Sequence, residues 1–145
     1  MVRESILRYR MNSEDAHYLG GVVQPNKHLD IYGDVGTELC VLQDGDESLF
    51  LGYDDVEFLA PVYVGDIIEC RGKIIKLGNT SRTCKFQTYK VATPAKRLGK
   101  ENAAENDVVA LDPPVLVCEA IGTLVVKKPM QRGVQPSGVV ENKWD

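Results

Sequence analysis

Most of the chain alternates between hydrophobic and polar positions with a period of two, which is typical of half-buried β-strands. This alternation and several short apolar runs predict strands over residues 5–11, 48–53, 56–60, 67–77, 80–92 and 115–128. The Gly78-Asn79 pair between two of these segments favours a tight hairpin turn. The sequence therefore predicts an antiparallel sheet of five or more strands.

The stretch over residues 30–43 has a helical period instead. Its apolar residues recur at spacings of three and four positions, which predicts an amphipathic helix with one apolar face formed by Ile31, Val35, Leu39 and Leu42. Pro25 suits the first turn of this helix, and Gly45 suits the left-handed position past its end. A sheet wrapped around one central helix makes an α+β domain.

The pattern predicts one domain over residues 1–128, followed by a C-terminal tail over residues 129–145. Within the domain, residues 93–112 form a polar insertion that we expect to be a long exposed loop with at most a short turn. The tail has little apolar content apart from Trp144, so it is either loose or docked on another part of the protein.

Composition and charge narrow the class of protein. The 145-residue chain has a net charge of -4 and a pI near 5.2, which argues against a dedicated nucleic-acid binder. No apolar run approaches the ~18 residues of a membrane-spanning helix, and the N-terminus lacks the apolar region of a signal peptide. We therefore expect a small cytoplasmic enzyme or binding module.

The cysteines are spread singly, without the close pairs that zinc sites use, at Cys40, Cys70, Cys84 and Cys118. They predict buried thiols that pack as small apolar groups, and no metal site.

Two acidic residues, Asp34 and Glu38, lie four positions apart on one face of the predicted helix, beside its apolar stripe. Neighbouring carboxylates raise one another's pKa, which suits proton transfer near neutral pH. The alternative is that both acids are solvated at the edge of the helix. Gly33 and Gly36 indicate that something approaches the helix closely, and the sheet, a partner helix and a ligand all remain open.

Other candidates are less specific. His17, which precedes the Gly20-Gly21 pair, could donate a hydrogen bond to a carbonyl oxygen or be structural. Glu57, in an apolar strand, is either solvent-exposed or an inward-pointing acid. Basic residues form two groups that could hold a small polyanion or simply be solvated: Arg71, Lys73, Lys76, Arg82 and Lys85 on the hairpin, and Lys127, Lys128 and Arg132 after the last strand.

Four segments of the sequence resemble a known family. Residues 58–66 (FLAPVYVGD) resemble the strand-turn signature of the hotdog fold, which acyl-CoA thioesterases and dehydratases share. Residues 15–18 (DAHY), 33–39 (GDVGTEL) and 78–81 (GNTS) resemble the β-aminoacyl-CoA ammonia-lyases more narrowly. The resemblance covers residues 5–92 and 113–133, and it leaves the insertion unplaced.

The resemblance implies a hotdog-fold homodimer with two sites at the subunit interface, and three such dimers in a hexamer. It implies reversible elimination of ammonia from 3-aminobutyryl-CoA or β-alanyl-CoA, giving crotonoyl-CoA or acryloyl-CoA without a metal or redox cofactor. The expected catalytic residues are Asp34, Glu57 of the other subunit, Glu38 and His17. The expected residues that bind the CoA ester are Tyr18, Gly36, Asn79, Thr80, Ser81, Arg132 and, as a weaker candidate, Arg82.

Two other functions stay open at this level. An acyl-CoA thioesterase would share the fold, but Gly21 stands where one thioesterase branch has its catalytic aspartate. A non-catalytic acyl-CoA-binding module would not need the two helix acids. The sequence also leaves open which carboxylate is the base. It does not show whether C3 of the substrate carries hydrogen or methyl, because spacing does not identify the pocket wall, and one methyl group is worth only ~1–3 kcal/mol of discrimination.

Overall fold

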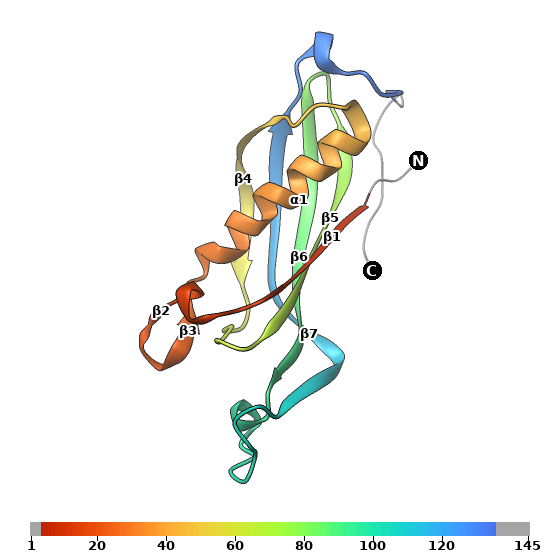
Figure 1. Ribbon diagram of the computed structural model, residues 1–145. Helices are drawn as coiled ribbons and strands as arrows, with labels where there is room; N and C mark the ends of the chain where they lie inside the picture. The colour runs from red at the N-terminus through yellow and green to blue at the C-terminus, as the bar shows by residue number, and fades with distance from the viewer. Residues whose placement is uncertain (1–3, 136–145) are drawn as a thin grey trace.

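A single long helix lies across one face of a five-stranded antiparallel sheet in the computed structural model, which describes residues 4–135 (Figure 1). The sheet has the order β1-β5-β6-β7-β4, so β1 and β4 are its edges. Its strands are β1 (Glu4–Arg10), β4 (Leu49–Phe58), β5 (Ile67–Leu77), β6 (Ser81–Pro94) and β7 (Val108–Val125). This arrangement confirms the predicted α+β hotdog architecture.

Shorter elements join these strands. A small two-stranded sheet, β2 (Ala16–Tyr18) and β3 (Val22–Val23), precedes the helix. Single 3₁₀ turns cover Ser13–Asp15, Leu19–Gly21, Ala95–Leu98 and Lys128–Met130. Helix α1 (Asn26–Asp44) is the longest helix of the described residues, and no helix among them is long and apolar enough to cross a membrane.

The ends of α1 agree with the prediction. Pro25 precedes its first residue, and Gly45 follows its last in the left-handed conformation (φ 70°), with its N–H bonded to the carbonyl of Val41. The buried face differs in one respect, because Leu42 is 43% exposed. The helix instead turns Tyr32 into the core, where its ring stacks on Phe86 with centroids 4.9 Å apart.

Strand pairing confirms the predicted hairpin between β5 and β6. The Gly78 N–H donates to the Ser81 carbonyl at 2.8 Å and closes the turn. The two strands predicted between residues 48 and 60 form one strand, β4, which pairs with β7 along its whole length with two irregularities of register. All four cysteines are fully buried, and burial raises the pKa of the Cys40 thiol to about 11 and that of Cys70 to about 12.

The polar insertion is more regular than the sequence suggested. Strands β6 and β7 extend into it and pair as far as Pro94 and Val108, so residues 95–107 form the end of a projecting hairpin (Figure 1). Arg97 ties this hairpin back to the domain by donating to the Gly20 carbonyl at 2.8 Å and covering the Tyr63 ring. Backbone pairing overrode the turn-forming composition of this segment.

The described part of the tail docks on the C-terminal end of α1. The Arg132 N–H donates to the Asp44 carbonyl at 3.1 Å, and the Gln43 side-chain amide donates to the Val134 carbonyl at 2.8 Å. The remainder of the predicted tail, including Trp144, lies outside the described residues.

Candidate functional site

A small apolar cavity of about 280 Å³ opens at the N-terminal end of α1. The β2–β3 sheet, the first turn of the helix and the segment after β4 enclose it, and its lining residues are Tyr18, Val22, Val23, Pro25, His28, Phe58, Leu59, Ala60, Pro61 and Val62. The volume is near the ~300 Å³ lower limit of small-ligand cavities, so it fits a short acyl group better than a long chain.

One polar side chain that lines this cavity, His28, is buried against the core. His28 is only 4% exposed, and its Nδ1 lies 3.1 Å from the hydroxyl of Thr88 on β6. The same hydroxyl lies 2.7 Å from the Tyr32 hydroxyl. Burial lowers the pKa of His28 to about 4, so the ring is neutral at physiological pH. The sequence analysis singled out His17 and missed His28, although its position one turn into the helix start was visible.

The backbone at the helix start is partly occupied. The N–H groups of Lys27 and His28 already donate to the carbonyls of Gln24 and Pro25, at 3.0 and 3.2 Å. These two helix-start donors are therefore not available for a ligand.

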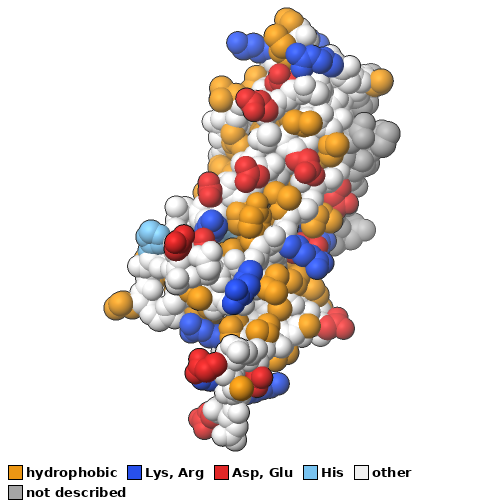
Figure 2. Space-filling model, viewed as in Figure 1, with side chains coloured by type: hydrophobic (Ala, Val, Ile, Leu, Met, Phe, Trp, Pro, Cys, Tyr) orange, Lys and Arg blue, Asp and Glu red, His pale blue; other side chains and the backbone are white. Residues whose placement is uncertain are grey.

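The two helix acids lie on the exposed face of α1. Asp34 and Glu38 are both solvent-exposed in the single chain, and acidic side chains follow this face in Figure 2. Gly36 is on the opposite side, where a Cβ would come within 2.9 Å of Leu124. This close approach to the sheet explains Gly36, which is therefore unavailable to CoA, whereas Gly33 faces open space.

Strand alternation places three of the predicted site residues, Tyr18, His17 and Glu57, on different faces of their strands. Tyr18 lines the cavity, but the adjacent His17 is exposed and points to the other side of β2. Glu57 is paired opposite Glu119, one position from Val56, which packs on the core. Its carboxylate therefore lies on the face of the sheet away from α1. Within one chain, Glu57 and Asp34 therefore lie on different sides of the sheet, and the prediction that Glu57 acts with Asp34 of the other subunit stays a prediction.

Arg82, the weaker candidate for CoA phosphate, has a structural role in this chain. Its guanidinium makes a bidentate ion pair with Asp44, at 2.7 and 3.0 Å, and both side chains are 0% exposed. The Gln135 side chain bonds to both partners. The alternation of the sequence assigns Arg82 to one face of the hairpin. It does not show that the carboxylate of Asp44, at the end of α1, lies against that face.

Arg132 and the Asn79–Ser81 turn do lie together, as the sequence analysis proposed. The Gln131 side chain, next to Arg132, donates to the Asn79 carbonyl at 2.8 Å. Arg132 itself donates to the Gly45 carbonyl at 2.7 Å and keeps its side chain 58% exposed. This group, however, lies at the C-terminal end of α1, and a 19-residue helix is about 28 Å long.

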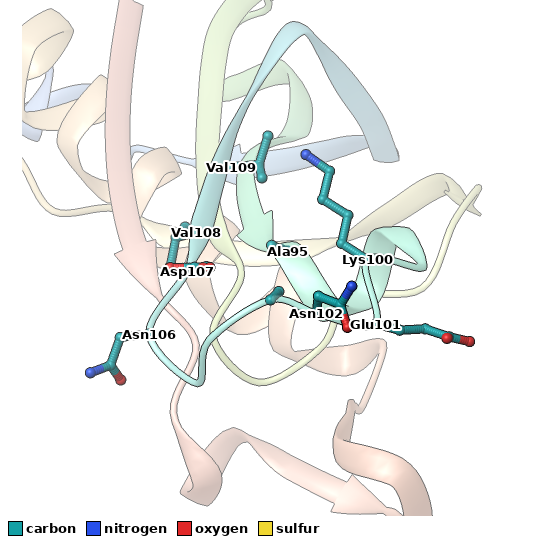
Figure 3. A pocket seen from close by; sticks show the side chains of 9 residues that line it. Ala95, Lys100, Glu101, Asn102, Asn106, Asp107, Val108 and Val109 are labelled. Carbon is teal, nitrogen blue, oxygen red and sulfur yellow. The ribbon is translucent and has the colours of Figure 1, made fainter.

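A larger hollow of about 770 Å³ lies beside the end of the projecting hairpin. Figure 3 shows Glu101 and Asn106 pointing outward from its rim rather than converging on a common point. Such an open arrangement lacks the enclosed, convergent geometry of a small-molecule site. Among residues 4–135, no cluster of three or more His, Cys, Asp or Glu side chains could hold a metal ion.

Known proteins share this architecture. Residues 34–91 match the family model described as Thioesterase superfamily. An acyl-CoA hydrolase from Staphylococcus aureus, solved with butyryl-CoA and CoA, superimposes with a TM-score of 0.68 at 14% identity, over 97% of this chain and 73% of that chain. At that identity the likeness shows the fold alone. Together these matches show the hotdog fold, with the match to the thioesterase-superfamily model confined to residues 34–91.

Two matches are much more specific. The chain is 48% identical over 129 residues to a 3-aminobutyryl-CoA ammonia lyase from Acetoanaerobium sticklandii, covering 89% of this chain and 98% of that protein. It superimposes on β-alanyl-CoA:ammonia lyase from Clostridium propionicum with a TM-score of 0.83 and 46% identity, over 93% of this chain and 92% of that chain. The chain belongs to this family of β-aminoacyl-CoA ammonia-lyases, which confirms the resemblance found in its motifs.

Proposed function

We propose that this protein is a cytoplasmic carbon–nitrogen lyase that eliminates ammonia reversibly from a short 3-aminoacyl-CoA and leaves the 2-enoyl-CoA. The observation that carries the proposal is the 48% identity to a named 3-aminobutyryl-CoA ammonia lyase over nearly the whole of both chains. The small apolar cavity at the start of α1 supports it, because its size suits a three- or four-carbon acyl group. Coenzyme A is part of the substrate, and the reaction needs no further cofactor.

The reaction divides into three tasks for the protein. A base removes the proton at C2, a hydrogen-bond donor stabilises the thioester enolate oxygen, and an anionic group holds the amine, which is a cation before it leaves. We assign the first and third tasks to Asp34 and Glu38, whose carboxylates share one face of α1. Glu57, on the other face of the sheet, receives no task.

We infer a homodimer formed through the edge strand β4. Large apolar side chains of this edge are exposed in the single chain, including Leu49 at 75% and Leu51 at 71%. Two β4 strands paired antiparallel would place the Phe58 end of one beside the Leu49 end of the other. The C-terminal end of one subunit's α1, with Arg132 and the Asn79–Ser81 turn, would then approach the other subunit's cavity.

This arrangement explains how CoA could reach both groups. The acyl end would enter the cavity of one subunit, while the phosphates would meet Arg132 and the turn of the partner. Hexameric thioesterases with this fold are known, including one from Yersinia pestis with a TM-score of 0.65 and 21% identity, and we propose three dimers per assembly here as well. Sedimentation at several protein concentrations will test this state.

The activity is tested in the direction of addition. The protein is incubated with crotonoyl-CoA or acryloyl-CoA and ammonium, and loss of the enoyl thioester absorbance is followed with free thiol measured in parallel. Loss of absorbance without thiol release supports the lyase. Thiol release without loss of the double bond would identify a thioesterase instead, and saturable binding with neither change would identify a binding module.

Asp34→Asn is the variant that tests the site. The amide keeps the shape of the carboxylate but cannot accept a proton, so kcat is expected to fall ~10²–10⁴-fold while the oligomer and Tm stay unchanged. Glu57→Gln is the matched control, because it makes the same chemical change on the other face of the sheet. Equal losses in both variants would contradict the assignment of Asp34.

A further inference from the structure

One buried polar group at the cavity has no role in the assignments above. The Nδ1 edge of the His28 ring faces Thr88 in the core, while the ring also lines the cavity. The bond directions at Nδ1 and Nε2 of an imidazole ring diverge widely, so Nε2 points away from Thr88. Nε2 has no hydrogen-bond partner among the described residues and is not a buried unpaired atom, which leaves it open toward the cavity. Apart from the exposed Tyr18, the cavity wall offers no other polar side chain.

The hydrogen bonds around Thr88 determine which ring nitrogen carries the proton. The Tyr32 hydroxyl lies 2.7 Å from the Thr88 oxygen but 3.5 Å from its other acceptor, the Cys118 carbonyl. Either hydroxyl could donate across the 2.7 Å contact, but the 3.5 Å contact to Cys118 is at the limit of a hydrogen bond, so the arrangement that gives each hydroxyl a well-placed acceptor has Tyr32 donating to Thr88. The Thr88 hydroxyl proton is then free to point at His28 Nδ1, since the only other contact at this hydroxyl is the weakly accepting sulfur of Cys70 at 3.4 Å.

We propose that the Nε2–H of His28 donates a hydrogen bond to the thioester oxygen of the substrate and stabilises the enolate. This proposal rests on the proposed lyase function. When the base takes the C2 proton, the electron pair moves onto the thioester oxygen, which Nε2–H holds. The pair then returns to form the C2–C3 double bond as ammonia leaves C3, and His28 keeps its proton throughout.

The surroundings suit this role. A neutral ring can donate one hydrogen bond without giving up its proton, and the lowered pKa of His28 keeps it neutral over the whole working range. The Thr88 contact fixes the ring from behind, so the donor is held in place before the substrate arrives. The exposed His17 has no such support, and the N–H groups of Lys27 and His28 are already bonded.

The position of His28 on the helix also fits a site shared by two subunits. His28 and Asp34 are six residues apart, which at about 100° per residue places them on different faces of α1. His28 faces the core and Asp34 faces outward, so a reacting carbon held at the cavity is better placed for the Asp34 of a second chain. The inferred β4 dimer supplies such a second chain.

Three measurements test the proposal, and the first uses the unmodified protein. In ¹⁵N NMR between pH 5.5 and 8.5, the His28 ring is expected to show a bare Nδ1 and a protonated Nε2. In infrared spectra of bound crotonoyl-CoA labelled at the carbonyl, the stretching frequency is expected to fall below that of the free ester. The opposite tautomer or an unshifted carbonyl would overturn the proposal.

The variants separate hydrogen bonding from packing. In His28→Asn the amide can still meet Thr88 but has no atom at the Nε2 position, so kcat is expected to fall ~10²–10³-fold and the carbonyl shift to disappear. In His28→Gln the longer amide returns a donor to that position, and both properties are expected to recover in large part. Full activity in a folded His28→Asn protein would rule His28 out.

The outcomes distinguish this proposal from the proposed function. If the unmodified protein adds no ammonia to any enoyl-CoA, the lyase function fails, whatever His28 does. If the protein is an active lyase and His28→Asn leaves kcat and the carbonyl frequency unchanged, the role of His28 alone fails.

Discussion

The two ends of α1 bury polar groups under the same helix but in opposite ways. At the C-terminal end, Asp44 and Arg82 are completely buried, and each is bonded by the other and by Gln135. At the N-terminal end, His28 is bonded on one side by Thr88 and lines an open cavity on the other. The first network is closed by the chain itself, while the second leaves one donor for a ligand.

The difference follows from what covers each end. The tail folds over the C-terminal end, where the Gln43 side chain and the backbone N–H of Arg132 hold it. A buried charge without its partner costs several kcal/mol, so this closure stabilises the fold. Among residues 4–135, no comparable segment covers the cavity at the other end, whose walls are the β2–β3 sheet and the segment after β4. A polar network whose members bond only to one another therefore indicates a structural role. A network that leaves one donor open to a cavity indicates a binding site.

The largest effect is expected at the closed end. Arg82→Met leaves the Asp44 carboxylate buried without its partner, so the free energy of unfolding in urea is expected to drop by about 3–5 kcal/mol. Combining it with Asp44→Leu removes both charges and is expected to recover much of this loss. If Arg82→Met instead raised KM for the CoA ester and left the unfolding midpoint unchanged, Arg82 would be a phosphate ligand after all.

The open end is expected to respond to pH. The pKa of His28 is lowered from 6.5 to about 4 on folding, so the unfolded chain binds more protons between these values. Stability is therefore complete above pH 6.5 and falls as the pH drops toward 4, by about 3 kcal/mol from this residue. Chemical unfolding of the protein and of His28→Gln at several pH values measures the effect. A His28→Gln curve as steep as that of the unmodified protein would assign the loss to other groups.

A smaller effect is expected for the tail. Gln135→Ala removes one hydrogen bond to each member of the buried ion pair, at 2.7 and 2.8 Å. Hydrogen bonds to charged groups contribute about 1.5–3 kcal/mol, and water can replace part of this at the protein surface, so a loss of about 1–2 kcal/mol in unfolding free energy is expected. The kcat should be unaffected, and a change in kcat would mean that the closed end also shapes the site.

The smallest effect is expected at Arg132, and it tests whether the C-terminal end of α1 in one subunit lies near the cavity of the other subunit. Arg132→Ala removes an exposed cation that could contact a CoA phosphate, so KM is expected to rise by up to about fivefold with kcat unchanged. The rise should shrink at high ionic strength. Lys128→Ala, a nearby exposed cation, is the matched control. Identical KM values for both variants and the unmodified protein at low salt would remove the tail from the CoA site.

Local patterns in the sequence were sufficient for much of the architecture. The apolar period predicted the helix over residues 30–43, and Pro25 and Gly45 marked the positions that flank α1. Gly78-Asn79 predicted the β5–β6 hairpin, and all these signals act through neighbouring positions of the chain. The four cysteines were correctly predicted as buried thiols. The motifs also identified the ammonia-lyase family, which the comparisons confirmed.

The candidate site depended on contacts that no local pattern encodes. Arg82 and Asp44 are 38 positions apart, and His28 and Thr88 are 60 apart, so only the packing of α1 on the sheet shows that they meet. Strand alternation left the side of Glu57 open, and the pairing of β4 with β7 decided it. The sequence by itself determined the central helix, the main strands, the fold and the family, because these follow from short-range periodicity and motifs. The tertiary structure decided which polar groups are closed and which one is left to face a ligand, because burial and hydrogen bonding are properties of the packed chain.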